Sequence, residues 1–211
     1  MWAFVPPGNL GRVLEIGCAS GIFIESLEAT ERWGVEPNEV VACQARDRGI
    51  NVLVGLYAEV ESSLPDAHFE LIVINDVIEH MTDHEQFLLD VKKKLSPQGC
   101  LIGSVPNIRH LSELLKLVVM KDWRYTEEGV LDKTHFRFFT HRSLRRSLEA
   151  TGYEVERIKG LRSVFRIDPG IPLSKTIANW LVTLFAIVVT LGHAVDTQYL
   201  QFGFRARPRA P

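Results

Sequence analysis

Two patterns of apolar residues recur along this chain, one typical of buried strands and the other typical of helices. Short, almost continuous apolar runs are typical of strands buried on both faces of a parallel sheet. Stretches with apolar residues three and four positions apart follow these runs and are typical of helices that cover the sheet. The pattern predicts an α/β fold, with strands at 13–16, 33–36, 51–55, 69–75, 100–105 and 153–159 and helices at 21–29, 38–48, 82–95 and 140–151.

The loop after the first strand carries the first functional signal. It reads Gly17-Cys18-Ala19-Ser20-Gly21, between an apolar run and a helix. A dinucleotide fingerprint has glycine where this chain has Ala19 and Ile22, which disfavours a dehydrogenase. Glu15, two residues before the loop, suits a cationic ligand better than a pyrophosphate.

The segment from Glu15 to Gly21 resembles motif I of the class I S-adenosylmethionine-dependent methyltransferases, in which the position of Ala19 is usually glycine. The resemblance implies a Rossmann-like seven-stranded sheet, mostly parallel with an antiparallel last strand at 199–205, and helices on both faces. It implies S-adenosylmethionine as cofactor, and the length of 211 residues indicates one domain over residues 1–211. It also implies that an acid at the end of the second strand, Glu36, binds the ribose. The cofactor-binding residues expected are Glu15, Gly17, Cys18, Ala19, Gly21, Glu36, Pro37 and Asn75.

A segment inserted at about 108–140 is dense in aromatic and ionisable residues and is expected to cover the site. Its Asp-x-Thr-His-x-Arg-Phe-Phe string resembles the substrate cap of a bacterial methyltransferase subgroup found beside sugar-modifying enzymes. We predict His135 as the general base, because its ordinary pKa lies near neutral pH, with Asp132 orienting it. Substrate-binding candidates are Trp123, Tyr125, Arg137 and His110. The alternative is that His135 and Arg137 form a polar network that pins the cap to the sheet.

Three possible metal ligands follow the fourth strand. Asp76, Glu79 and His80 lie at i, i+3 and i+4, so one helical turn would place them on one face. Quinone-biosynthesis O-methyltransferases have an acid-x-x-Glu-His string of this kind and use it for metal. In the alternative, Asp76 caps a helix, Glu79 completes a capping box and no metal is bound.

A second insertion, at about 161–198, contains the uncharged apolar stretch 177–191. A membrane span needs about 20 residues, so we predict a helix buried in the core or in a homodimer interface. The alternative hypothesis is that residues 173–195 make a peripheral contact with a membrane.

Composition adds few constraints. The net charge of −2 gives no bulk attraction to nucleic acid. The cysteines Cys18, Cys43 and Cys100 have no metal-like spacing and are expected to be reduced thiols of a cytoplasmic protein. The N-terminus does not resemble a signal peptide. The first strand begins almost at once, so the helical material usual before it is either truncated or replaced by another covering segment.

The sequence therefore predicts methyl transfer to a small-molecule acceptor, with the hydroxyl oxygen of a saccharide or related metabolite as first choice. One alternative is a metal-assisted O-methyltransferase that acts on a quinone- or phenol-type acceptor. Another is a non-catalytic cofactor-binding partner of a glycosyltransferase or a membrane assembly.

Overall fold

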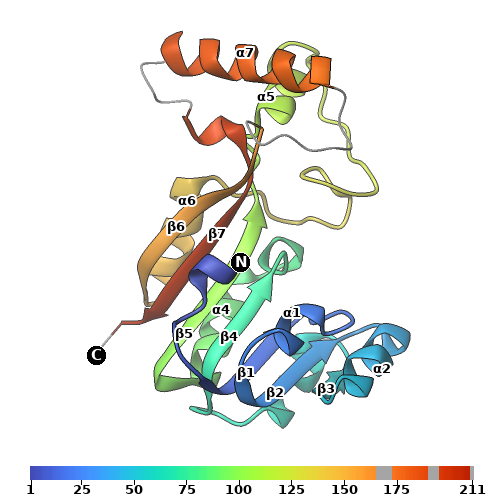
Figure 1. The fold of residues 1–211 in the computed structure, drawn as a ribbon, viewed down its shortest axis with the longest axis vertical. Helices are drawn as coiled ribbons and strands as arrows, with labels where there is room; N and C mark the ends of the chain where they lie inside the picture. The colour runs from blue at the N-terminus through green and yellow to red at the C-terminus, as the bar shows by residue number, and fades with distance from the viewer. Residues whose placement is uncertain (165–172, 190–194, 210–211) are drawn as a thin grey trace.

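The computed structural model describes residues 1–164, 173–189 and 195–209 and contains one seven-stranded sheet (Figure 1). The strand order is β3-β2-β1-β4-β5-β7-β6. Strands β1 to β5 pair in parallel, and β7 lies antiparallel between β5 and β6. The predicted fold class is confirmed. The strands are β1 (Leu10–Ile16), β2 (Ala29–Glu36), β3 (Asn51–Val54), β4 (Phe69–Asn75), β5 (Leu95–Pro106), β6 (Tyr153–Ser163) and β7 (Tyr199–Pro208).

Helices cover both faces of this sheet because the central strands are apolar on both sides. On one face, Phe87, Leu88 and Leu144 pack against Ile72 and other residues of the sheet. On the other face, the core includes Phe4, Ile24 and Ala42. The helical elements are η1 (Trp2–Phe4), α1 (Ile22–Glu25), α2 (Glu39–Asp47), α3 (Tyr57–Val60), η2 (Glu61–Ser63), η3 (Ile78–His80), α4 (His84–Lys94), α5 (Leu111–Val118), α6 (His141–Ala150), α7 (Leu173–Val189) and η4 (Val195–Gln198).

Some predicted boundaries are wrong. The helix expected at 21–29 is only the short α1, since β2 already begins at Ala29 and pairs there with Leu10. The fifth strand begins at Leu95 rather than Cys100, because Leu95 pairs with Phe69 before an irregularity in the β4–β5 register. Pairing with a neighbouring strand, which local periodicity does not report, decides both boundaries.

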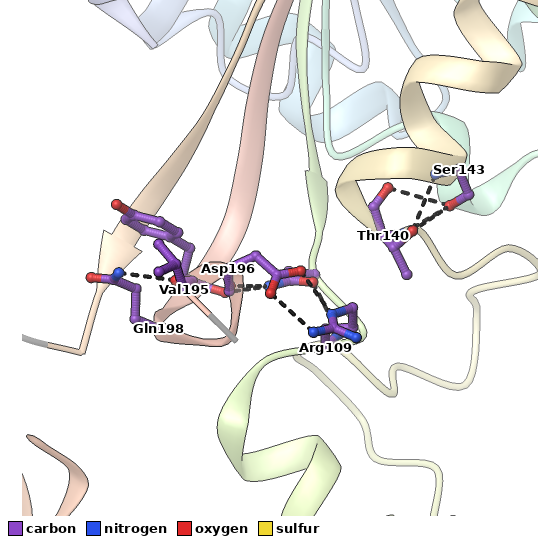
Figure 2. Close-up of polar contacts among 8 residues, drawn as sticks. Arg109, Thr140, Ser143, Val195, Asp196 and Gln198 are labelled. Carbon is purple, nitrogen blue, oxygen red and sulfur yellow. Dashed lines mark hydrogen bonds and ion pairs between the residues drawn. The ribbon is translucent and has the colours of Figure 1, made fainter. Parts of the chain in front are cut away.

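The end of β5 is tied to the segment that leads into β7. The Arg109 guanidinium pairs with the Asp196 carboxylate, with Nε–Oδ2 and Nη2–Oδ1 distances of 2.7 and 3.1 Å (Figure 2). The Asn107 amide donates to the carbonyls of Asp196 and Tyr199 at 2.9 and 2.8 Å. These contacts hold the start of the first insertion against the end of the second.

The helix expected inside the second insertion exists as α7, but it is not buried in the core of this chain, so that alternative is wrong; burial in a homodimer interface stays a prediction. Its apolar side chains Leu181, Leu184 and Phe185 are more than half exposed. Positions 165–172 and 190–194 of that insertion, including the predicted helix end at Leu191, lie outside the described residues. No helix in the described part of the chain is long and apolar enough to cross a membrane.

Candidate active site

Three residues of the loop after β1 have left-handed backbone conformations. Gly17, Ala19 and Gly21 have φ angles of 72°, 45° and 79°, a region that glycine tolerates and alanine disfavours. This conformation explains why the position of Ala19 prefers glycine. The amides of Gly17 and Cys18 donate to the Val35 carbonyl at 2.8 and 3.1 Å, so the loop is attached to β2. Cys18 is buried, and its carbonyl accepts a hydrogen bond from the Gly21 amide at 2.8 Å, so both of its backbone groups stabilise the loop.

Glu36 ends β2 beside this loop and binds it directly. Its Oε2 accepts a hydrogen bond from the Ala19 amide, and its Oε1 accepts one from the Asn38 amide, both at 2.9 Å. Each carboxylate oxygen retains a further acceptor site, so binding of the ribose by Glu36 stays a prediction. Pro37, between Glu36 and Asn38 in the sequence, is exposed. The contact with Ala19 shows that Glu36 also holds the loop in shape.

Glu15 and Asn75 form a buried polar pair at the neighbouring ends of β1 and β4. The Asn75 amide nitrogen lies 3.4 Å from Glu15 Oε1. Within the described residues, Glu15 Oε2 and Asn75 Oδ1 are buried without a hydrogen-bond partner. Burial raises the pKa of Glu15 to about 8, and the nearby Ile24 amide and Asn75 offset this only in part. Two orphaned acceptors call for a ligand that carries N–H or O–H donors, and the amino group and hydroxyls of S-adenosylmethionine fit them.

A second group of polar side chains combines two residues that follow β4 in η3 with one residue of the first insertion. Ligand atoms of Glu79, His80 and His135 all lie within 4.8 Å of one another. Glu79 is fully buried, and neither carboxylate oxygen has a hydrogen-bond partner among the described residues. Burial, and secondarily Asp76, raises the pKa of Glu79 well above its ordinary value. Burial and then His135 lower the pKa of His80, which favours the neutral imidazole that metal binding and base catalysis require.

His135 reaches this cluster because its loop is attached to η3. The amides of Phe136 and Arg137 donate to the Glu79 carbonyl at 2.8 and 3.0 Å. His135 Nδ1 lies 3.1 Å from the Val130 carbonyl, to which it can only donate. This contact assigns the proton to Nδ1 and leaves Nε2 as an acceptor or ligand atom. The first insertion therefore places His135 beside η3, the element that follows β4.

Asp76 plays neither of the roles proposed from the sequence. It has a left-handed φ of 52°, and its carboxylate accepts hydrogen bonds from Ser104 Oγ and Gln201 Nε2 at 2.9 and 2.8 Å. The capping box is wrong, because η3 has no side-chain cap and Glu79 points into the interior. The structure groups Glu79 and His80 with His135 rather than with Asp76, and metal binding by any of them stays a prediction.

Asp132 does not orient His135 as predicted. Its carboxylate accepts hydrogen bonds from the amide and hydroxyl of Thr134 at 2.7 and 2.6 Å, and these bonds hold the pKa of Asp132 below its ordinary value. The Val130 carbonyl orients the His135 ring instead. Thr134 Oγ1 also lies 3.1 Å from His80 Nδ1. Asp132 therefore contacts the cluster indirectly, through Thr134 and His80, and not through His135.

A cavity of about 230 Å³ opens beside the cluster, and the predicted substrate residues do not line it. Arg137 donates to the Thr82 carbonyl, His110 Nδ1 lies 2.8 Å from Ser112 Oγ, and Tyr125 is half exposed. Sequence reasoning missed Arg162, Leu200 and Gln201, which come from β6 and β7 and have no local signal. The lining is Asp76, Glu79, Pro106, Gly129, Val130, Asp132, His135, Arg162, Leu200 and Gln201.

Comparison with known proteins supports the class that this geometry defines. Residues 3–158 match the methyltransferase domain family, and the chain belongs to it. A ubiquinone biosynthesis O-methyltransferase of Rickettsia canadensis is 25% identical over 157 residues, which cover 71% of this chain and 65% of that protein. A probable S-adenosylmethionine-dependent methyltransferase of Mycolicibacterium smegmatis is 29% identical over 151 residues, covering 71% of this chain and 54% of the relative. The chain thus matches somewhat less than two thirds of these relatives' length.

A solved structure extends the likeness beyond the matched region. A SAM-dependent methyltransferase from Archaeoglobus fulgidus superposes with a TM-score of 0.63 at 20% identity, over 93% of this chain and 86% of that one. The predictions of an S-adenosylmethionine-dependent methyltransferase fold, of an enzyme class and of the cofactor are confirmed at the level of the family.

Proposed function

We propose that this chain transfers a methyl group from S-adenosylmethionine to a hydroxyl oxygen of a small molecule bound beside Glu79, His80 and His135. One observation carries the proposal: the buried Glu79 carboxylate has two unpartnered oxygens and two imidazoles within 4.8 Å, next to a cavity. An unpartnered buried carboxyl is costly for folding alone, so a role in binding accounts for it.

The chain places the two reactants next to each other by its own connectivity. Asn75 ends β4 on the cofactor side, and the next five residues supply the Glu79–His80 side of the acceptor pocket. When bound, S-adenosylmethionine supplies an activated methyl group on a positively charged sulfur. Positioning of this kind is worth about 7–11 kcal/mol in favourable cases. Alignment of the acceptor by the pocket is therefore the main contribution we assign to the protein.

The cluster has the composition of a divalent metal site. One carboxylate and two imidazoles suit zinc or another borderline divalent ion. Glu79, His80 and His135 would hold the ion. A bound ion there would lower the pKa of a coordinated hydroxyl. Val130 and Thr134 then serve to orient the two imidazole ligands.

A phenol-type hydroxyl is the acceptor that we favour. The cavity combines apolar Pro106, Val130 and Leu200 with the polar cluster, which suits a ring that carries a hydroxyl group. The name of the Rickettsia relative, a ubiquinone biosynthesis O-methyltransferase, supports this choice. A saccharide hydroxyl is the second candidate, because Asp76, Asp132 and Gln201 could hydrogen-bond several hydroxyls.

A second mechanism needs no metal and follows from the tautomer of His135. With the proton on Nδ1, its Nε2 could take the proton of the acceptor hydroxyl as the oxygen–methyl bond forms. The proton would then leave to solvent, and the other product would be S-adenosylhomocysteine.

The test is a methylation assay that includes catechol-type phenols and free or nucleotide-linked saccharides, read by mass spectrometry. We expect phenol methylation that is lost in chelator and restored by a divalent ion. Titration calorimetry with Zn²⁺ or Mn²⁺ alone should show a site in wild type that Glu79→Gln weakens at least 10-fold. The matched control, Glu154→Gln, changes an exposed acid on β6 and should bind as wild type.

Each other outcome decides between the alternatives. Turnover that resists chelation but fails in Glu79→Gln or His135→Gln would favour the metal-free base. Methylation of saccharides alone would exclude the phenol-type acceptor. Tight cofactor binding with no turnover on any acceptor would overturn the enzymatic proposal in favour of a cofactor-binding partner.

A further inference from the structure

Helix α7 has the inverse of the usual surface pattern. Its buried side chains include Thr176 and Thr183, which are 5% and 0% exposed, and the Trp180 indole donates to the Val164 carbonyl at 2.6 Å. Its outward side chains recur three or four residues apart, as on one stripe of a helix. Apart from the exposed Ser174, the exposed residues of α7 whose burial is described are apolar, and they include Ile177, Leu181, Leu184, Phe185 and Val188. A helix covered only by water would have the opposite arrangement.

Helix α5 and the residues after it repeat this inversion. Glu113 is buried and accepts a hydrogen bond from Lys116 Nζ at 3.0 Å, whereas the apolar residues around the helix end are exposed. These exposed residues are Leu115, Leu117, Val118, Val119 and Met120. Figure 1 shows α5 and α7 at the same end of the molecule, beyond the sheet. We call α7 and residues 115–125 together the apolar end.

Cationic and aromatic side chains accompany the exposed apolar residues. Between positions 115 and 125 the chain has three cations, Lys116, Lys121 and Arg124, and a single acid, Asp122. Lys121 and Arg124 are exposed. Trp123 is 38% exposed and contacts the Phe138 ring at 5.4 Å between centroids. This combination of cations, an amphipathic aromatic residue and aliphatic side chains is typical of segments at a membrane–water interface.

We propose that the apolar end docks on the surface of a phospholipid bilayer that contains anionic lipids. The outward stripe of α7 and the aliphatic residues after α5 would enter the boundary between headgroups and acyl chains. Lys121 and Arg124 would contact the anionic headgroups, each worth a few-fold in affinity. The contact is peripheral, since no helix of the described residues could span a membrane.

Charge favours a bilayer over a second copy of the chain. In a two-fold dimer the same patch meets itself, so the net positive charge of residues 115–125 on one copy would face the same net positive charge on the other. Like charges brought together at an interface oppose association. An anionic lipid surface complements these cations.

The experiment is flotation of the purified protein with vesicles of phosphatidylcholine alone and of phosphatidylcholine with phosphatidylglycerol. We expect binding to the anionic vesicles that weakens at high salt, and little binding to the neutral ones. The double variant Leu181→Ser/Phe185→Ser should lower the binding constant at least 10-fold. Lys121→Gln/Arg124→Gln should lower it several-fold on anionic vesicles only.

Val40→Ser is the matched control. Val40 is 73% exposed on α2, away from the apolar end, and its replacement should leave vesicle binding unchanged. Absence of wild-type binding to both vesicles, or equal loss in Val40→Ser and the α7 variant, would overturn the proposal. A dimer in light scattering that the α7 variant abolishes, without vesicle binding, would assign the surface to a second copy. Cofactor titration of the same variants is independent of this result and tests the proposed function separately.

Discussion

The cofactor side and the acceptor side of this molecule are built in different ways. On the cofactor side, the Ala19–Glu36 hydrogen bond joins residues 17 positions apart, within one strand–loop–helix–strand unit. On the acceptor side, Asp76 is held by Gln201, 125 positions away, and His135 arrives on an inserted loop. The first arrangement is encoded locally, whereas the second depends on the whole sheet closing with β7. Four predictions sharpen the first half of this contrast, because they separate the local contacts of the cofactor side from the core and from the apolar end; they are given in order of decreasing effect.

The largest predicted effect is a difference in the free energy of unfolding between a substitution in the core and one at the apolar end. Leu14 is fully buried in β1, and Leu14→Ala should lower the free energy of unfolding by about 2–5 kcal/mol through lost burial and a cavity. Leu181 is 63% exposed on α7, and Leu181→Ala should change stability by less than about 0.5 kcal/mol. Urea denaturation of both variants measures this difference. Equal losses would mean that α7 is buried in solution.

The next effect concerns the carboxylate that holds the loop. Glu36→Ala removes the acceptor for the Ala19 and Asn38 amides as well as the predicted ribose ligand. Hydrogen bonds to a charged group contribute about 1.5–3 kcal/mol, so S-adenosylmethionine affinity should fall roughly 10- to 100-fold. Glu39→Ala, which changes an exposed acid three residues later, is the control for titration calorimetry. Equal affinities of the two variants would contradict the role of Glu36.

A smaller effect should appear as a pH dependence. Because the pKa of Glu15 is raised from 4.5 to about 8, the folded protein holds this proton more tightly than the unfolded chain. The resulting stabilisation is complete below pH 4.5 and is lost as pH rises through about 8. If the ionised carboxylate binds the cofactor ammonium, affinity should instead increase with pH, about 10-fold per unit, up to that value.

Glu15→Gln should flatten both profiles. Calorimetry in buffers of different ionisation enthalpy should also detect proton release on binding in wild type and none in the variant. A wild-type affinity independent of pH between 6 and 8 would show that Glu15 does not contact the cofactor as an anion.

The smallest predicted effect is a change in stability caused by a substitution in the loop after β1. Ala19 has a φ of 45°, so Ala19→Gly relieves backbone strain while adding freedom to the unfolded chain. The two terms nearly cancel, and we expect a gain of less than about 1 kcal/mol. Ala45→Gly, inside α2, should instead cost about 1 kcal/mol or more. Thermal unfolding compares the two; a clear loss in Ala19→Gly would contradict the strained path.

The sequence by itself determined the elements whose signals are local. Val13 to Gly21 predicted a buried strand, a glycine loop and a helix, because apolar runs and left-handed positions are properties of neighbouring residues. The acid at the end of the second strand and the antiparallel last strand followed from the family resemblance. The stretch 177–191 predicted a helix for the same local reason, although its surroundings did not follow from it.

Only the tertiary structure decided which side chains meet. His135 replaced Asp76 in the cluster because backbone hydrogen bonds to Glu79 place its loop against η3. Val130 rather than Asp132 orients that histidine, and Gln201 reaches Asp76 across the β5–β7 pair. The outward direction of the α7 stripe depends on what its other face packs against. These outcomes depend on contacts between segments far apart in the chain, and local residue patterns contain no information about such contacts.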